Sequence, residues 1–189
     1  LQEADGTVWH TAKSGSTATP FFLTTDAAEG TWDLWFPGQS GCYYTNVNTT
    51  KKLWTALWMP TLNVSGIDGG ITMEYKRDKN QWQGIFTATG AGTINIQMNG
   101  TGKLYDNTSV SGADNSIDDT KAKDTPFAFS GSANELTFNT GTNVSAGNIT
   151  VNVPAAGECT LIIDLNDPQA WKVEVTEGGS IEPTYPSYL

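Results

Sequence analysis

The last third of the chain contains the stretch that decides the fold, Ile149-Thr150-Val151-Asn152-Val153. Apolar and polar residues alternate in it, which is the period of a β-strand with one buried face. Apolar residues also alternate through residues 157–165 and 171–175, and the turn-forming Asn166-Asp167-Pro168 separates these two segments. The last third therefore predicts three strands, of which the last two are joined by a turn.

Strand patterns continue toward the amino terminus. They cover residues 31–36, 53–59, 71–75, 81–88 and 94–98. Asn99-Gly100 predicts a hairpin turn that returns through residues 103–105, and residues 106–125 predict a long polar loop. No segment has a convincing helical period. We therefore expect an all-β protein, a β-sandwich of which the jelly roll is one form, with a single domain over residues 1–176 and a linker-like tail at 177–189.

Composition and charge exclude several partner classes. The 189 residues include 20 acidic and 10 basic side chains, which gives a formal net charge of −10 and repels phosphate backbones and anionic membrane surfaces. Nucleic acid is therefore not an expected partner. No stretch approaches the roughly 20 apolar residues of a membrane helix, so the sequence predicts no transmembrane segment in this chain.

The motifs of the common enzyme classes are missing from the sequence. The single histidine, His10, has no Gly-x-Ser-x-Gly elbow to act with, and no nucleotide-binding or zinc-protease motif occurs. Two well-placed carboxylates are enough for a glycosidase. Four glutamates on or beside predicted strands could supply them, but carboxylates that alternate along a strand surface are the simpler interpretation. They are Glu74, Glu135, Glu158 and Glu174. We expect a protein that is not an enzyme and needs no cofactor.

A run of acidic residues in the 106–125 loop is the only motif that suggests a metal. It consists of Asp114, Asp118, Asp119 and Asp124. Oxygen ligands suit calcium, but a solvated loop is the favoured interpretation of the run. We predict no metal site and leave calcium in this loop open.

Two tryptophans on one strand predict a ligand-binding face. In residues 53–59, Trp54 and Trp58 share one face, and at about 3.3 Å per residue their rings stand roughly 13 Å apart. Aromatic rings beside hydrogen-bonding groups suit sugars, which expose C–H patches and hydroxyls. Lys51 and Lys52 supply such groups nearby, and Trp35 and Tyr43 are further candidates. The alternative is that at least one of Trp54 and Trp58 is buried between two sheets.

The two cysteines lie far apart in the sequence, Cys42 after a glycine-containing turn and Cys159 on the apolar face of a strand. Two cysteines cannot complete a zinc site by themselves. A disulfide between Cys42 and Cys159 and a pair of buried thiols are both consistent with the sequence.

The closing segments resemble modules of the SusE/SusF family. Residues 157–165 read Gly-Glu-Cys-Thr-Leu-Ile-Ile-Asp-Leu and lead into Trp171-Lys172-Val173-Glu174-Val175. In that family a Gly-x-Tyr-x-Ile-x-x-Asp-Leu strand turns into a final alternating strand; here Cys159 stands in place of the aromatic residue. The tail Tyr185-Pro186-Ser187-Tyr188-Leu189 also looks like the opening of a following module.

The resemblance implies a β-sandwich module of a surface-exposed outer-membrane lipoprotein of Bacteroidetes. Such modules bind starch or other polysaccharides without cleaving them, next to outer-membrane transport partners. We therefore expect a non-catalytic carbohydrate-binding module at the cell surface, with its anchor outside this chain. The alternative is a structural subunit of fimbrial or adhesin type, which would share the Thr, Gly and Asn content and offer an edge strand for assembly.

Overall fold

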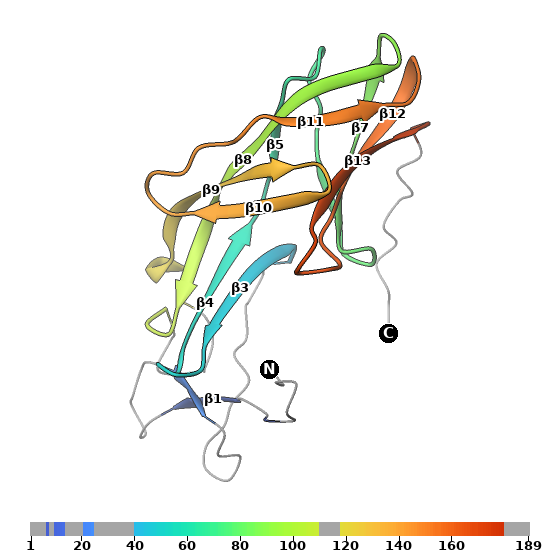
Figure 1. Ribbon diagram of the computed structural model, residues 1–189. Helices are drawn as coiled ribbons and strands as arrows, with labels where there is room; N and C mark the ends of the chain where they lie inside the picture. The colour runs from blue at the N-terminus through green and yellow to red at the C-terminus, as the bar shows by residue number, and fades with distance from the viewer. Residues whose placement is uncertain (1–6, 8–9, 14–20, 25–39, 110–117, 180–189) are drawn as a thin grey trace, which may run out of the picture. The chain divides into compact units, whose positions relative to one another are not determined.

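The computed structural model describes residues 7, 10–13, 21–24, 40–109 and 118–179, and the regular secondary structure of these residues is almost entirely β-strand (Figure 1). The only helical element among them is a short 3₁₀ helix, η1 (Asp119–Lys121). The prediction of an all-β sandwich is confirmed, since two antiparallel sheets pack together. No helix of the described residues has the length and apolar character to cross a membrane.

The chain divides into two compact units. Unit 1 comprises Leu1–Met59 and Lys103–Asp124, and unit 2 comprises Pro60–Gly102 and Thr125–Leu189. The sequence-based domain bounds, residues 1–176 and 177–189, stay predictions, although the last strand runs through to Glu177.

Unit 2 contains the sandwich. One sheet is formed by β10-β9-β8, with β5 and β11 also paired to β8, and the other has the order β13-β12-β7-β6. The bounds are β5 (Asn63–Ser65), β6 (Glu74–Lys76), β7 (Gln81–Ala88), β8 (Gly92–Asp106), β9 (Lys123–Ser132), β10 (Glu135–Thr140), β11 (Ile149–Val153), β12 (Gly157–Asp164) and β13 (Lys172–Glu177).

The core of unit 2 follows the alternation that the sequence shows. In β11, every second residue is buried, and β12 buries its apolar row in the same way. The most deeply buried side chains, each at most 2% exposed, include Ile96, Met98, Ile149, Val151, Leu161 and Ile163. The closing segments form the predicted antiparallel hairpin, in which Ile163 is opposite Val173.

The predicted hairpin at Asn99-Gly100 is wrong. Strand β8 runs without a break from Gly92 to Asp106 and passes straight through both residues. Gly100 does not adopt a positive φ. A Cβ atom at Gly100 would lie 2.4 Å from Cζ of Phe127, so the glycine allows an aromatic ring to pack on the strand backbone rather than allowing a turn.

Unit 1 is built around the β3–β4 hairpin. Strand β3 (Cys42–Asn48) pairs with β4 (Leu53–Met59), and β4 pairs with the last residues of β8, with Ala56 opposite Tyr105. A separate hairpin joins β1 (His10–Lys13) to β2 (Phe21–Thr24). The predicted strand at residues 31–36, which includes Trp35, lies outside the described residues.

Candidate functional site

A row of three side chains crosses the sheet of unit 1 on one face. The register sets Tyr43 of β3 opposite Trp58 of β4, and Trp58 opposite Lys103 of β8. Directly opposite residues of antiparallel strands project to the same face, with Cβ atoms about 5 Å apart. The three strands therefore place a phenol, an indole and a lysine side chain side by side.

The indole of Trp58 is held in one orientation. Its Nε1 donates a hydrogen bond of 3.1 Å to the carbonyl oxygen of Ser40. A Cβ atom at Gly41 would lie 3.3 Å from the same Nε1, so the backbone passes close to the ring. The side chain is half-buried, which leaves part of a fixed aromatic ring open to a ligand.

Trp54 does not share this exposure. Its side chain is only 6% exposed and forms a buried cluster with Ala56 and Tyr105. Tyr43, Val47, Trp58 and Ala122 pack against that cluster. The expectation that Trp54 offers a second stacking ring is therefore wrong, and the alternative that at least one of the two tryptophans is buried is confirmed.

Lys51 and Lys52 lie in the turn between β3 and β4. The backbone N–H of Lys51 donates to Oδ1 of Asn48 at 2.8 Å, and Lys52 adopts a φ of 57°. Both are exposed. Lys52 is six residues from Trp58, which is about 20 Å along the strand. The structure therefore places both lysines at the Trp54 end of β4 and does not bring them together with Trp58.

A lysine that the sequence did not single out, Lys103, lies beside Trp58. The Nζ atom of Lys103 is 2.5 Å from Oδ1 of Asp124, and both side chains are substantially exposed. Lys123 makes a longer ion pair of 3.9 Å with Asp106. The alternation of Lys103 with Tyr105 could have indicated a shared face, but only the register shows that this face is also that of Trp58.

Tyr43 and Trp58 of this row pack against a buried cluster that contains the phenol of Tyr105. The hydroxyl of Tyr105 donates a 2.8 Å hydrogen bond to Oδ1 of Asp119. Burial, and then the negative charge of Asp119, raise the pKa of Tyr43 to about 12. Tyr43 therefore keeps its proton at ordinary pH and can donate a hydrogen bond from the rim of the site.

The carboxylates of the acidic loop have partners within the protein. Oδ1 of Asp118 accepts hydrogen bonds from both the backbone and the hydroxyl of Thr120. Asp119 accepts from Tyr105, and Asp124 pairs with Lys103. Over the described ranges, no group of three or more metal-ligating side chains is gathered, and Asp114 lies outside those ranges.

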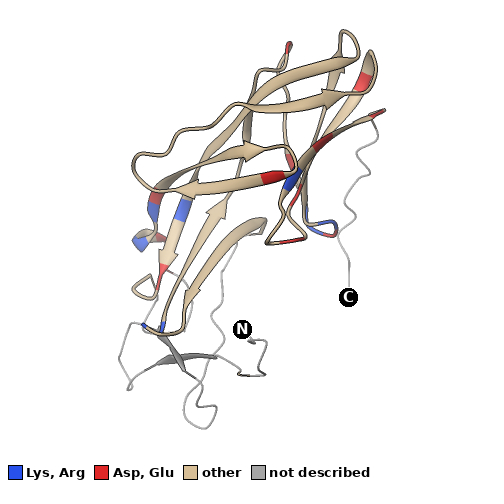
Figure 2. Cartoon of the chain, in the orientation of Figure 1, with Lys and Arg blue, Asp and Glu red and all other residues tan. Residues whose placement is uncertain are grey.

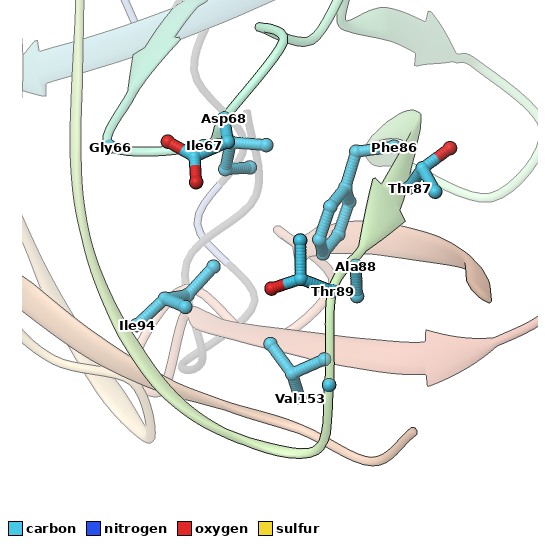
Figure 3. Close-up of a pocket in the computed structure, with 10 residues that line it drawn as sticks. Gly66, Ile67, Asp68, Phe86, Thr87, Ala88, Thr89, Ile94 and Val153 are labelled. Atoms are coloured by element: carbon cyan, nitrogen blue, oxygen red, sulfur yellow. The ribbon is translucent and has the colours of Figure 1, made fainter. Parts of the chain in front are cut away.

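Unit 2 contains a small pocket at one end of β7 (Figure 3). Its volume is about 90 Å³, and its lining includes Phe86, Ile94 and Val153 with the oxygens of Asp68 and Thr89. Ligand sites are usually about 300–1,000 Å³. This pocket is therefore too small for a sugar unit.

Both cysteines are buried. Cys42 in unit 1 and Cys159 in unit 2 are 3% and 0% exposed. A disulfide between them stays a prediction, beside the alternative of two buried thiols. Each sulfur occupies an apolar position of its strand, where cysteine packs as a small hydrophobic residue.

Comparison with known proteins finds two family matches. Residues 1–59 match the model of a family described as a domain of unknown function (DUF5111), and residues 63–179 match that of a second family with the same description (DUF5114). The two matches meet where unit 1 gives way to unit 2 after Met59. No curated protein and no solved structure matches the chain.

Proposed function

The chain belongs to the family described as domain of unknown function DUF5114, and we propose that it is a non-catalytic carbohydrate-binding module that captures a polysaccharide. The observation that carries this proposal is the half-buried indole of Trp58, fixed by its hydrogen bond to Ser40. A fixed ring loses little conformational freedom when a ligand stacks on it.

The groups around Trp58 complement a sugar ring. The C–H face of a pyranose packs on an aromatic ring, while its hydroxyls need donors and acceptors at the edge. Tyr43 supplies a neutral hydroxyl on one side of Trp58, and the ion pair of Lys103 with Asp124 supplies charged groups on the other. Charged groups make the stronger hydrogen bonds to a neutral partner.

Binding without cleavage is part of the proposal. A glycosidase needs one carboxyl group as acid and a second as base or nucleophile. Around Trp58, Asp124 is paired with Lys103, and Asp119 accepts a hydrogen bond from the hydroxyl of Tyr105. Both carboxylates therefore have a role in holding the site together.

The cellular setting of the proposal rests on the resemblance of the β12–β13 hairpin to SusE/SusF modules. We propose a position at the cell surface, anchored to the outer membrane by a part of the protein outside this chain, beside transport partners that take up the captured polysaccharide. Whole-cell labelling with an antibody against this chain tests that placement, and protein found only inside lysed cells would contradict it.

The function is tested by affinity electrophoresis in gels that contain neutral or charged polysaccharides. The intact chain should be retarded by at least one polysaccharide, and Trp58→Ala should reduce the retardation at least tenfold, since it removes the stacking ring. Trp54→Phe is the matched control, because it changes a buried ring on the same strand. Equal loss in Trp58→Ala and Trp54→Phe, or no retardation of the intact chain by any polysaccharide, would contradict the proposal.

The stability of the same variants separates binding from folding. Trp54→Ala should lower the free energy of unfolding by about 3–5 kcal/mol, as for other buried tryptophans. Trp58→Ala should cost less, about 1–3 kcal/mol, because part of its ring already contacts water and the bond to Ser40 is worth about 1 kcal/mol. Urea denaturation of both variants measures the difference.

A further inference from the structure

We propose that unit 2 carries a second binding site, a groove between β11 and β13 that takes a segment of an uncharged polysaccharide. The groove has a volume of about 410 Å³, within the usual range of ligand sites. It is lined by Thr93, Ala133, Asn134, Thr150, Val151, Asn152, Val173, Glu174 and Val175. The ligand class rests on the proposed carbohydrate-binding function, but the residues are separate from the Trp58 row.

Two edge strands form the walls of the groove. Strand β11 pairs with β8, and β13 is the last strand of its sheet, so each presents one edge with backbone N–H and C=O groups. The β9–β10 turn closes one end, because the N–H of Val173 donates to the carbonyl oxygen of Ala133 at 2.8 Å. Edge backbone groups and side chains together can therefore bond to a ligand that lies along the groove.

Four of the nine side chains that line the groove carry an amide or a hydroxyl. Asn134, Asn152, Thr93 and Thr150 are all exposed, and amides and hydroxyls both donate and accept, as sugar hydroxyls do. The hydroxyl of Thr150 is oriented by a 2.7 Å bond to Oδ1 of Asn95. These groups can form hydrogen bonds with the hydroxyls of a sugar, and they do not require the ligand to carry a charge.

The β11 wall of the groove is free of charged residues, whereas β13 contributes the exposed carboxylate of Glu174 to the lining. Neither β11 nor β8 between Gly92 and Gly102 contains an acidic or basic side chain (Figure 2), although the chain has a net charge of −10. The hydrogen bond from Gln97 to Asn148, at 2.8 Å, continues the row of amides. Contact with this wall requires no ion to be desolvated. The carboxylate of Glu174 on the other wall can accept hydrogen bonds from sugar hydroxyls but repels an anionic ligand, which favours a neutral polymer.

An inserted peptide strand suits the groove less well. Val151 and Val173 at its floor are only 2% and 3% exposed. The apolar core beneath the groove is therefore already covered and does not need an added strand to bury it. The edge of β13 is also occupied at Val173 by the β9–β10 turn, which leaves the short run from Glu174 to Glu177. A neutral glycan that forms hydrogen bonds mainly with protein side chains does not require a longer strand edge.

The experiment measures binding of neutral oligosaccharides by calorimetry in the full chain carrying Trp58→Ala, so that any remaining binding reports the groove. The oligosaccharides are fragments of an α-glucan, a β-glucan and a galactomannan. Residual binding is expected to at least one fragment, and adding Asn134→Ala with Asn152→Ala should weaken it about tenfold through loss of two hydrogen-bonding groups. Asn99→Ala, an exposed change on β8 outside the groove, is the matched control and should change binding less than twofold.

The outcomes separate the two sites. If Trp58→Ala abolishes all binding, the groove proposal is overturned while the proposed function stands. If Trp58→Ala binds as the intact chain does and the groove variants lose binding, the groove stands and the Trp58 site falls. Unchanged binding in the groove variants, or competition by an extended peptide rather than by a sugar, would also overturn the groove proposal.

Discussion

Tyr43 makes the Trp58 site sensitive to alkaline pH. The pKa of Tyr43 is raised to about 12 by burial and by Asp119, whereas an unfolded chain loses this proton near pH 10. Between these values the folded state holds more protons than the unfolded state, so the stabilisation is complete below about pH 10 and is lost as pH rises through about 12. Tyr105, whose pKa burial and its bond to Asp119 also raise, contributes in the same direction.

Asp119→Asn tests this prediction, because it removes the negative charge that opposes ionisation of Tyr43. Absorbance of tyrosinate during an alkaline titration should show that the tyrosines of raised pKa ionise at a lower pH in the variant than in the original chain. Tyr43→Phe and Tyr105→Phe assign the transitions. A titration curve that Asp119→Asn leaves unchanged would show that the carboxylate does not act on these phenols.

At the residue scale, the sequence predicted the strand of Trp54 and Trp58 but not which ring is open. Alternation along β4 places both on one face, and that is confirmed. The difference between them comes from contacts with residues that are remote in sequence: Tyr105 and Ala122 pack with Trp54, while Ser40 binds Trp58. No local pattern contains those contacts, so the sequence could state burial only as an alternative.

At the element scale, β8 depends on the absence of a side chain at Gly100. Gly100→Ala would place Cβ 2.4 Å from Cζ of Phe127 and 2.8 Å from the carbonyl oxygen of Thr61, and overpacking of this kind costs about 1–3 kcal/mol. Adding Phe127→Leu should recover part of the loss, so that the double variant is less destabilised than the sum of the single ones.

Urea denaturation of the two single variants and the double variant measures this coupling. Gly90→Ala is the matched control, since a Cβ there meets nothing within 4 Å and Gly90 has no positive φ. It should change the free energy of unfolding by no more than about 0.5 kcal/mol. Strictly additive losses for Gly100 and Phe127 would mean that the ring does not require the glycine.

The same glycine shows where prediction of the elements fails. Alternation located β4, β7, β11, β12 and β13 correctly, because burial of one sheet face imposes a period of two. Asn-Gly pairs favour turns for a conformational reason, but glycine also permits close packing, and the sequence cannot distinguish the two uses. The register of neighbouring strands also depends on pairing between residues that are distant in sequence. The sequence therefore did not predict that Lys103 lies beside Trp58.

At the scale of the whole molecule, the repeated alternation of apolar and polar residues predicted the fold class, and the family matches show in addition that the chain has two parts. The strand patterns and the lack of a helical period indicated an all-β protein, and the sandwich in unit 2 agrees. The boundary after Met59 is not marked by a linker-like composition, since Pro60 continues directly from β4. Only contacts and family matches reveal it, because each unit is assembled from segments distant in sequence.

Net charge predicts which polysaccharides the chain retains. With a net charge of −10, the protein should repel anionic polysaccharides at low ionic strength, where the field extends about 30 Å in 0.01 M salt and only about 3 Å in 1 M salt. Stacking on Trp58 and bonding to uncharged amides involve no net charge on the ligand, so retention of a neutral polysaccharide should change less than about twofold over that range. Affinity electrophoresis at both salt concentrations measures this. A steep loss of neutral binding with salt would contradict this prediction, because screening weakens contacts between charged groups and a neutral polysaccharide carries none.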